Sequence, residues 1–127
     1  MFIADTDVLI DFLRGAGEAE RIVIELGAGR LCTTAITAFE LWAGSKSPQQ
    51  VAAVECLLAA VTVLPLDVSS ARRAGEVRRD LERAGRTIGM ADSLIAGIAL
   101  NHDAILITRN REHYERVPGL NLTYKFI

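Results

Sequence analysis

The chain has 127 residues, half of them hydrophobic, which is enough to build one domain around a buried core. Fourteen lysines and arginines against sixteen aspartates and glutamates give a net charge of −2, which excludes a strongly basic or acidic binding protein. It has no run of about 18 apolar residues and no basic leader, and its two cysteines, Cys32 and Cys56, are predicted to be reduced core residues of a cytoplasmic protein.

The first half of the chain alternates short apolar runs with helical patterns. Residues 2–4 form a continuous apolar run, which is typical of a strand covered on both faces. A helix capped by Asp5 or Thr6 is expected next, through Leu13. The other elements predicted here are helix 18–26, strand 31–33, helix 37–46, helix 48–60 and strand 61–66.

The second half continues the same alternation. A long helix is predicted from a cap at Ser69 or Ser70, because apolar residues then recur every three or four positions, at Ala74, Val77, Leu81 and Ala84. It is followed by helix 90–101, strand 104–107, a helical turn at 110–116 and strand 122–127. Strands separated by helices predict a single α/β domain over residues 1–127, a three-layer α/β/α sandwich with a mostly parallel central sheet.

Polar clusters follow two of the predicted strands. Asp5, Asp7 and Asp11 come directly after the first strand, and Thr108-Arg109-Asn110 follows strand 104–107. Buried negative charge is costly unless something compensates it. Because ligands bind beyond the carboxyl ends of strands in parallel sheets, both clusters are candidates for one site.

Two more carboxylates lie in apolar surroundings. Glu40 follows Thr37 by three residues, which also fits a capping box in which Glu40 bonds to the Thr37 N–H. Asp92 lies on the apolar face of its helix, although a residue in a first turn also fits a simple partner of the helix dipole. If Asp5, Glu40 and Asp92 converge, they bind a hard cation such as Mg²⁺ or Mn²⁺, which beside a phosphate activates a water for in-line attack.

Three segments resemble PIN-domain ribonucleases, in particular the VapC toxins of VapBC toxin–antitoxin pairs. They are FIADTDVLIDFLRG at 2–15, TTAITAFELWAG at 33–44 and GMADSLIAGIALNHDAILITRNREHYERVPGL at 89–120. Together they cover nearly the whole chain in the family's order. The resemblance implies a metal-dependent endoribonuclease that hydrolyses structured RNA and leaves a 5′-phosphate and a 3′-hydroxyl.

The resemblance also implies roles for individual residues. Asp5, Glu40 and Asp92 would bind Mg²⁺ or Mn²⁺, and Asn110 would complete the catalytic group. Many members carry a further acid near this last position, where this chain has Asn110 and His113, so the number of metal ions stays open. The implied partners are a VapB-type antitoxin, whose C-terminal segment occupies the active-site groove, and a second copy of the chain in a homodimer.

The arginines and aromatic residues offer candidate RNA contacts. Six of the twelve arginines lie in residues 71–86, where acids four positions away also predict a solvated helix face laced with ion pairs. Arg109 and Arg111 flank Asn110 and are predicted phosphate contacts. Tyr114 and Trp42 are candidates for base stacking, although Trp42 is more typical of a core or a dimer interface.

Other functions remain open on the sequence alone. Asp5-Thr6-Asp7 after a strand also resembles the nucleophile and acid/base of a haloacid-dehalogenase-like phosphohydrolase. A degenerate PIN domain that only binds RNA or antitoxin is a non-enzymatic alternative. A receiver-like domain would use Asp67, and a metal-free ribonuclease would need His102 and His113 to face one phosphate.

Overall fold

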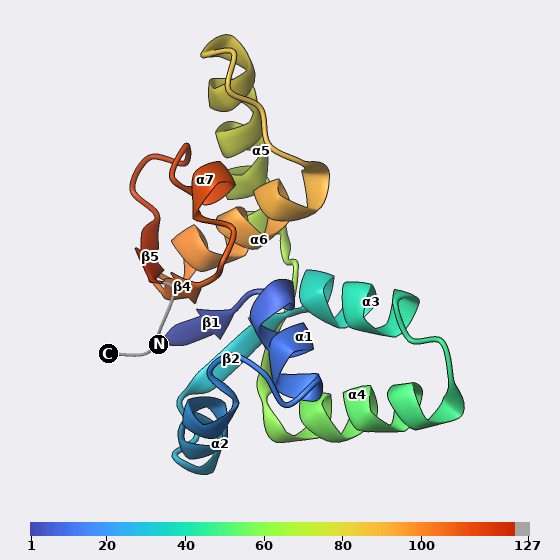
Figure 1. Cartoon of the computed structure of the whole chain (residues 1–127). Coiled ribbons are helices and arrows are strands. Elements are labelled where there is room, and N and C mark those ends of the chain that lie inside the picture. The colour runs from blue at the N-terminus through green and yellow to red at the C-terminus, as the bar shows by residue number, and fades with distance from the viewer. Residues whose placement is uncertain (124–127) are drawn as a thin grey trace.

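The computed structural model describes residues 1–123, in which a sheet lies between two groups of helices (Figure 1). The order of elements agrees closely with the predicted one. The last predicted strand, 122–127, is seen in part, because residues 124–127 lie outside the described residues. In chain order the elements are β1 (Phe2–Ala4), α1 (Thr6–Leu13), α2 (Ala19–Gly27), β2 (Leu31–Thr34), α3 (Ala35–Ala43), α4 (Pro48–Ala60), β3 (Thr62–Leu64), α5 (Val68–Arg83), α6 (Met90–Asn101), β4 (Ile105–Ile107), α7 (Arg111–Tyr114) and β5 (Asn121–Thr123).

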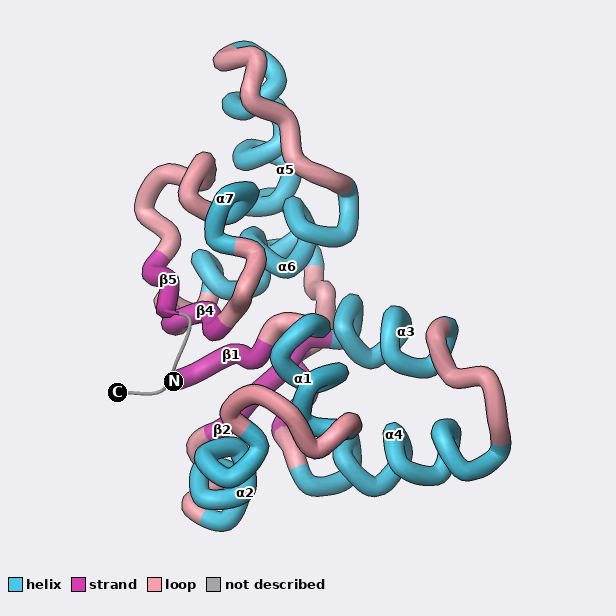
Figure 2. Tube along the Cα trace, in the orientation of Figure 1, coloured by secondary structure: helices cyan, strands magenta, loops and turns pink. Residues whose placement is uncertain are grey.

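The sheet has the strand order β3-β2-β1-β4-β5, and all its neighbouring strands are parallel. Consecutive residues of a strand point to opposite faces. Ile3 therefore belongs to the core under α5 and α6, whereas Ala4 belongs to the core under α1, α2 and α4. Figure 2 shows the strands in the middle, with helices on both sides. The predicted α/β/α sandwich is confirmed.

The strands that follow β1 in the chain are added first on one side of it and then on the other. From β1 it builds β2 and β3 on one side, then crosses over and builds β4 and β5 on the other. The backbone N–H of Asp5 donates to the carbonyl oxygen of Ile107 at 2.9 Å, so the ends of β1 and β4 lie side by side. This is a topological switch point, where open parallel sheets form their ligand sites.

The beginnings of two helices differ from the predictions. Helix α3 begins at Ala35, because the Thr34 hydroxyl accepts the Thr37 N–H at 3.1 Å. The predicted capping box with Glu40 is therefore wrong, and the Glu40 carboxylate is available for other contacts. Helix α5 is capped by Asp67, which accepts the Ser70 N–H at 2.8 Å, and not by Ser69 or Ser70.

Helices α5 and α6 pack closely against each other. The predicted stripe on α5 is buried at Ala74, Val77 and Leu81, whereas Ala84 ends the helix and is exposed. The close approach depends on Gly97 of α6. A Cβ atom at Gly97 would lie only 2.6 Å from both the Cβ and the backbone nitrogen of Ala74.

The exposure of individual side chains corrects two predictions, and two others are confirmed. Cys32 is buried as predicted, but Cys56 is exposed on α4, and neither forms a disulfide. Trp42 is 47% exposed, so it is not a core residue. The ion pairs predicted on α5 are present, Arg72 with Glu76 and Arg78 with Glu82. In residues 1–123, no helix is long and apolar enough to cross a membrane.

Candidate active site

Asp5 lies at the end of β1, where its side chain is 5% exposed. The Thr108 hydroxyl, at the end of β4, donates to Asp5 Oδ2 at 2.7 Å, and the Tyr114 hydroxyl lies 3.3 Å from Asp5 Oδ1. Asp5 occupies the N-cap position of α1 but makes no capping hydrogen bond there, so neither predicted cap, Asp5 nor Thr6, is confirmed. Burial raises the pKa of Asp5 to about 6, although the Thr108 hydroxyl opposes this rise.

Asp92 approaches Asp5 from the other side of the switch point. It lies in the first turn of α6, and its Oδ1 is 3.1 Å from the Tyr114 hydroxyl. Its Oδ2 accepts a hydrogen bond from Asn110 Nδ2 at 3.2 Å and lies 3.5 Å from His113 Nδ1. Asn110 therefore points a donor at Asp92. The side chain of Asp92 joins the site as its position on the apolar helix face predicts.

Tyr114 connects the two aspartates. It is fully buried, so the prediction that it stacks on bases is wrong. Burial, together with the negative charges of Asp5 and Asp92, raises the pKa of Tyr114 well above its usual range, so the hydroxyl keeps its proton.

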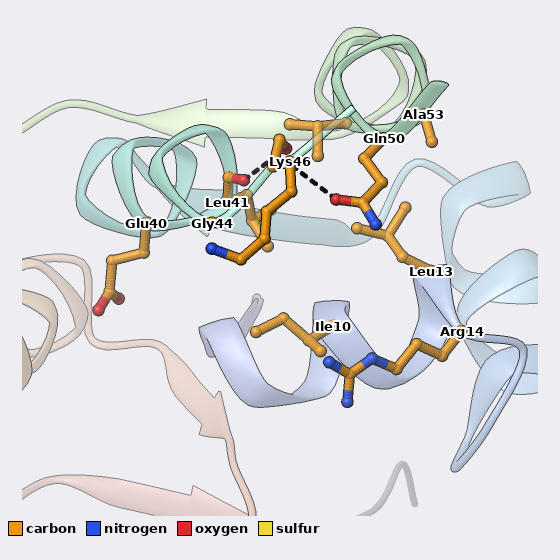
Figure 3. A pocket seen from close by; sticks show the side chains of 11 residues that line it. Ile10, Leu13, Arg14, Glu40, Leu41, Gly44, Lys46, Gln50 and Ala53 are labelled. Carbon is orange, nitrogen blue, oxygen red and sulfur yellow. Dashed lines mark hydrogen bonds between the residues drawn. The ribbon is translucent and has the colours of Figure 1, made fainter. Parts of the chain in front are cut away.

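Glu40 reaches the same region from α3. The Thr6 hydroxyl donates to Glu40 Oε1 at 2.7 Å and lies 3.0 Å from the Thr37 hydroxyl, so Glu40 is fixed beside the residue that follows Asp5. Figure 3 shows Glu40 at one end of a pocket of about 340 Å³ between α1, α3 and α4. The pocket has an apolar floor that includes Ile10, Leu13 and Leu41, and Arg14 and Lys46 bring two cationic groups to it.

The remaining acids of the first cluster bind Arg109. Its guanidinium group contacts both carboxylate oxygens of Asp11, at 2.7 and 3.2 Å, and its backbone N–H donates to Asp7 Oδ2 at 3.1 Å. Burial raises the pKa of Asp7, and Asp7 Oδ1 has no hydrogen-bond partner among the described residues. The contacts of Asp7 and Asp11 thus hold the loop after β4 against α1.

The oxygen donors of the site fit a hard cation. Mg²⁺ usually keeps several waters and needs only one or two carboxylates from a protein. Asp5 and Asp92 lie around Tyr114, and Glu40 is bonded to Thr6, the residue after Asp5. In residues 1–123, no three Asp, Glu, His or Cys side chains form a group that could hold a metal ion, so the convergence of Asp5, Glu40 and Asp92 on one cation stays a prediction.

Sequence reasoning missed two residues that hold the aspartates. The sequence places Thr108 only in a polar cluster, although its position at the end of a strand beside β1 is the signal for its bond to Asp5. For Tyr114 the sequence suggests contact with RNA bases. Its burial depends on the packing of α7 against α6, which no local pattern in residues 110–116 reveals.

Known proteins match this chain over most of its length. A family model described as "PIN domain" matches residues 2–120. The chain belongs to the PIN-domain family. A tRNA(fMet)-specific endonuclease VapC from Shigella flexneri is 32% identical over 123 residues, which are 94% of this chain and 93% of that protein. Ribonuclease VapC19 from Mycobacterium tuberculosis (strain ATCC 25618 / H37Rv) is 32% identical over 126 residues, covering 98% of this chain and all of that protein.

Solved structures of PIN-domain relatives agree with the fold. The chain matches DNA-bound VapBC from Salmonella typhimurium with a TM-score of 0.86 and 31% identity, over 96% of each chain. VapBC-1 from nontypeable Haemophilus influenzae gives a TM-score of 0.81 and 30% identity, again over 96% of each chain. These matches confirm that the chain has the fold of the VapC proteins in these structures.

Three of the alternative functions lose their basis. A PIN match over residues 2–120 overturns the phosphohydrolase hypothesis. Asp67 caps α5 after the edge strand β3, whereas a receiver needs its acceptor after a central strand. His102 follows the last residue of α6 and Asp92 lies in its first turn, about 15 Å away along a helix. His102 and His113 therefore do not face one phosphate.

Proposed function

We propose that this protein is an endoribonuclease toxin that hydrolyses phosphodiester bonds of structured RNA with the help of Mg²⁺ or Mn²⁺. The observation that carries the proposal is the pairing of Asp5, a buried acid at the switch point, with Asp92 around one hydroxyl group. The relatives at 32% identity that are named as endonuclease and ribonuclease support the RNA substrate. Asp5, Glu40 and Asp92 would hold the metal, and Asn110 would complete the catalytic group.

The chain's own residues prepare the site for this reaction. When bound, the metal supplies a Lewis acid that polarises the phosphate and makes a water nucleophilic near neutral pH. Thr108 and Asn110 fix the orientation of Asp5 and Asp92, and Thr6 does the same for Glu40. Attack by water on phosphorus, with cleavage of the bond to the 3′ oxygen and protonation of that oxygen, leaves a 5′-phosphate and a 3′-hydroxyl.

Cleavage of structured RNA by the purified protein is expected to require Mg²⁺ or Mn²⁺ and to stop in chelator. The measurement is the chemistry of the new ends, determined by labelling and mass spectrometry. Ends with 5′-phosphate support hydrolysis by water. Cyclic phosphate ends, or cleavage that continues in chelator, would contradict the metal mechanism. Binding of RNA without any cleavage would favour the degenerate PIN domain.

Arg109 and Arg111 are proposed to contact RNA phosphates beside the site. Both are exposed and flank Asn110, although Arg109 is paired with Asp11 and Arg111 lies 3.1 Å from Glu115. Arg111→Ala is expected to raise KM several-fold with little change in kcat. It should also reduce the slope of log affinity against log salt by about one.

Arg116→Ala is a matched control for Arg111→Ala, because the Arg116 guanidinium group bonds to the carbonyl oxygen of Thr87. An equal rise in KM in both variants would contradict a local phosphate contact. Arg109→Ala is less diagnostic, since it also removes the bonds to Asp11.

Two protein partners are proposed as well. The Salmonella and Haemophilus neighbours are titled as VapBC, which supports a VapB-type antitoxin for this chain. The exposed apolar residues Phe39, Trp42 and Val63 line one open hollow and support a homodimer. Sedimentation velocity tests the dimer, and a monomeric protein would contradict it. The proposed RNA substrate supports a cytoplasmic location for this activity.

A further inference from the structure

Each of the two aspartates at the switch point is held on its outer side by a separate donor. Thr108 donates to Oδ2 of Asp5 at 2.7 Å, and Asn110 donates to Oδ2 of Asp92 at 3.2 Å. The other oxygen of each carboxylate, Oδ1, faces Tyr114. The phenol oxygen is 3.3 Å from Oδ1 of Asp5 and 3.1 Å from Oδ1 of Asp92. Tyr114 is therefore the side chain that both carboxylates contact within the described residues 1–123.

The position of the hydroxyl is fixed by its surroundings. The side chain of Tyr114 is fully buried, in the same core cluster as Ile95, Leu106 and Val117. A buried ring in a packed core has little freedom to move, so its hydroxyl is a rigid reference point. The two carboxylates lie on different elements, Asp5 after β1 and Asp92 on α6. A hydroxyl that contacts both can therefore fix their positions relative to each other.

A tyrosine hydroxyl has a single proton, so it donates to only one carboxylate at a time. The contacts of the Tyr114 hydroxyl with Asp5 and with Asp92 therefore differ in strength at any moment. The hydroxyl lies between two side chains of like charge. A phenylalanine would fill the same space but leave the two Oδ1 atoms facing each other with no donor. The carboxylates would then separate by rotation, since they repel.

We propose that Tyr114 is a positioning residue whose hydroxyl sets the spacing of the Asp5 and Asp92 carboxylates. Through this spacing it sets the affinity of the site for Mg²⁺ or Mn²⁺. The inference rests on the proposed function, because it requires that the two aspartates hold a metal. Partners that orient metal-ligating side chains commonly change metal affinity by 10–100-fold when they are removed. Tyr114 contacts the ligands and not the substrate, so its effect belongs to metal binding.

The test is a Mn²⁺ titration of the metal-free protein, with free Mn²⁺ measured by electron paramagnetic resonance. Tyr114→Phe is expected to bind Mn²⁺ about 10-fold more weakly than the wild-type protein. The Mn²⁺ concentration for half-maximal RNA cleavage is expected to rise by the same factor. The kcat at saturating metal should stay within about two-fold, since the ligands themselves are intact.

Thr33→Val is the matched control. The Thr33 side chain is as buried as that of Tyr114, and its hydroxyl donates to the carbonyl oxygen of Ala4 at 2.8 Å without touching either aspartate. It therefore loses a buried hydrogen bond next to the site and should keep wild-type Mn²⁺ affinity. Thermal melting of both variants shows that each is folded during the titration.

Three outcomes overturn the inference. One is a Tyr114→Phe protein with wild-type Mn²⁺ affinity, and a second is an equal loss in Thr33→Val, which would indicate a general effect on stability. The third is a fall in kcat at saturating metal with unchanged Mn²⁺ affinity, which would place Tyr114 against the substrate. Failure of the proposed function looks different, since the wild-type protein itself would then bind no Mn²⁺ and cleave in chelator.

Discussion

The Asp5→Asn variant is expected to lose RNA cleavage and, in the metal-free state, to be more stable than the wild-type protein at pH 8. Burial raises the pKa of Asp5 from its ordinary 3.8 to about 6. A shift of this size corresponds to a destabilisation of about 3 kcal/mol by the ionised carboxylate. Asparagine removes that cost along with the charge that the metal requires.

The sign of the pH dependence follows from proton binding. Between pH 6 and 4 the native protein holds the Asp5 proton, whereas the unfolded chain has released it, so the cost of the carboxylate fades as the pH falls. The advantage of Asp5→Asn should therefore be full above pH 6 and nearly absent at pH 4.

An asparagine fits the contacts of Asp5 with one hydrogen bond reversed. The Thr108 hydroxyl accepts the Asn110 N–H at 2.9 Å, so its proton is available to donate to an amide oxygen at position 5. The amide nitrogen would then donate to the Tyr114 oxygen, and the Tyr114 proton would go to Asp92. No buried polar group loses its partner.

Urea denaturation in chelator at pH 8 and pH 5 measures the stability, and a cleavage assay in Mg²⁺ measures the activity. Cleavage should fall by at least about 100-fold, since removal of an outer partner alone reaches that size. Asp80→Asn is a control on an exposed part of α5 and should change neither quantity. An Asp5→Asn protein that is less stable than the wild-type protein at pH 8 would contradict the predicted cost of the ionised, buried carboxylate.

Gly97→Ala is expected to destabilise the protein by about 2 kcal/mol, although alanine is ordinarily the better helix former. The new Cβ would meet Ala74 at 2.6 Å, and one of the atoms it meets is a backbone nitrogen that no side-chain rotation moves away. Helix α6 must shift to relieve the clash. Because α6 carries Asp92, cleavage should fall together with stability.

Thermal unfolding checks this prediction, and the melting temperature should fall by about 8 °C. Gly75→Ala on α5 is the matched control, because a Cβ at Gly75 meets nothing within 4 Å. That variant should gain about 0.5–1 kcal/mol from helix propensity alone. If Gly97→Ala and Gly75→Ala both stabilise the protein, the prediction of a close contact between α5 and α6 at Gly97 is wrong.

Patterns of apolar residues predicted the fold almost completely. Continuous apolar runs at residues 2–4 and 104–107 gave the two central strands, and the polar residues after them, Asp5 and Thr108, lie side by side as expected. The beginnings of helices were harder, because several polar residues near each start are equally good caps. Asp67 and Thr34 accept the free N–H groups at helix starts for which the sequence predicts a cap at Ser69 or Ser70 and a first residue at Thr37.

The contacts inside the candidate site were not predictable from local sequence. Glu40 had an equally good local explanation in the capping box, and only the position of Thr6 on a neighbouring helix decides between them. Tyr114 is aromatic and lies near arginines, which is also typical of an RNA-binding surface. Its burial against α6 is a tertiary effect, and tertiary packing overrides such local preferences.

The hydrogen bonds of Asp5 join a residue that is synthesised early to residues that are synthesised late. Thr108 lies 103 positions after Asp5 and Tyr114 lies 109 positions after it, and β1 takes β4 as a neighbour only when the last part of the chain exists. During synthesis the Asp5 carboxylate therefore gains its hydrogen bonds from Thr108 and Tyr114 only after residue 114 has been added. The candidate site is one of the last parts of the molecule that can assemble.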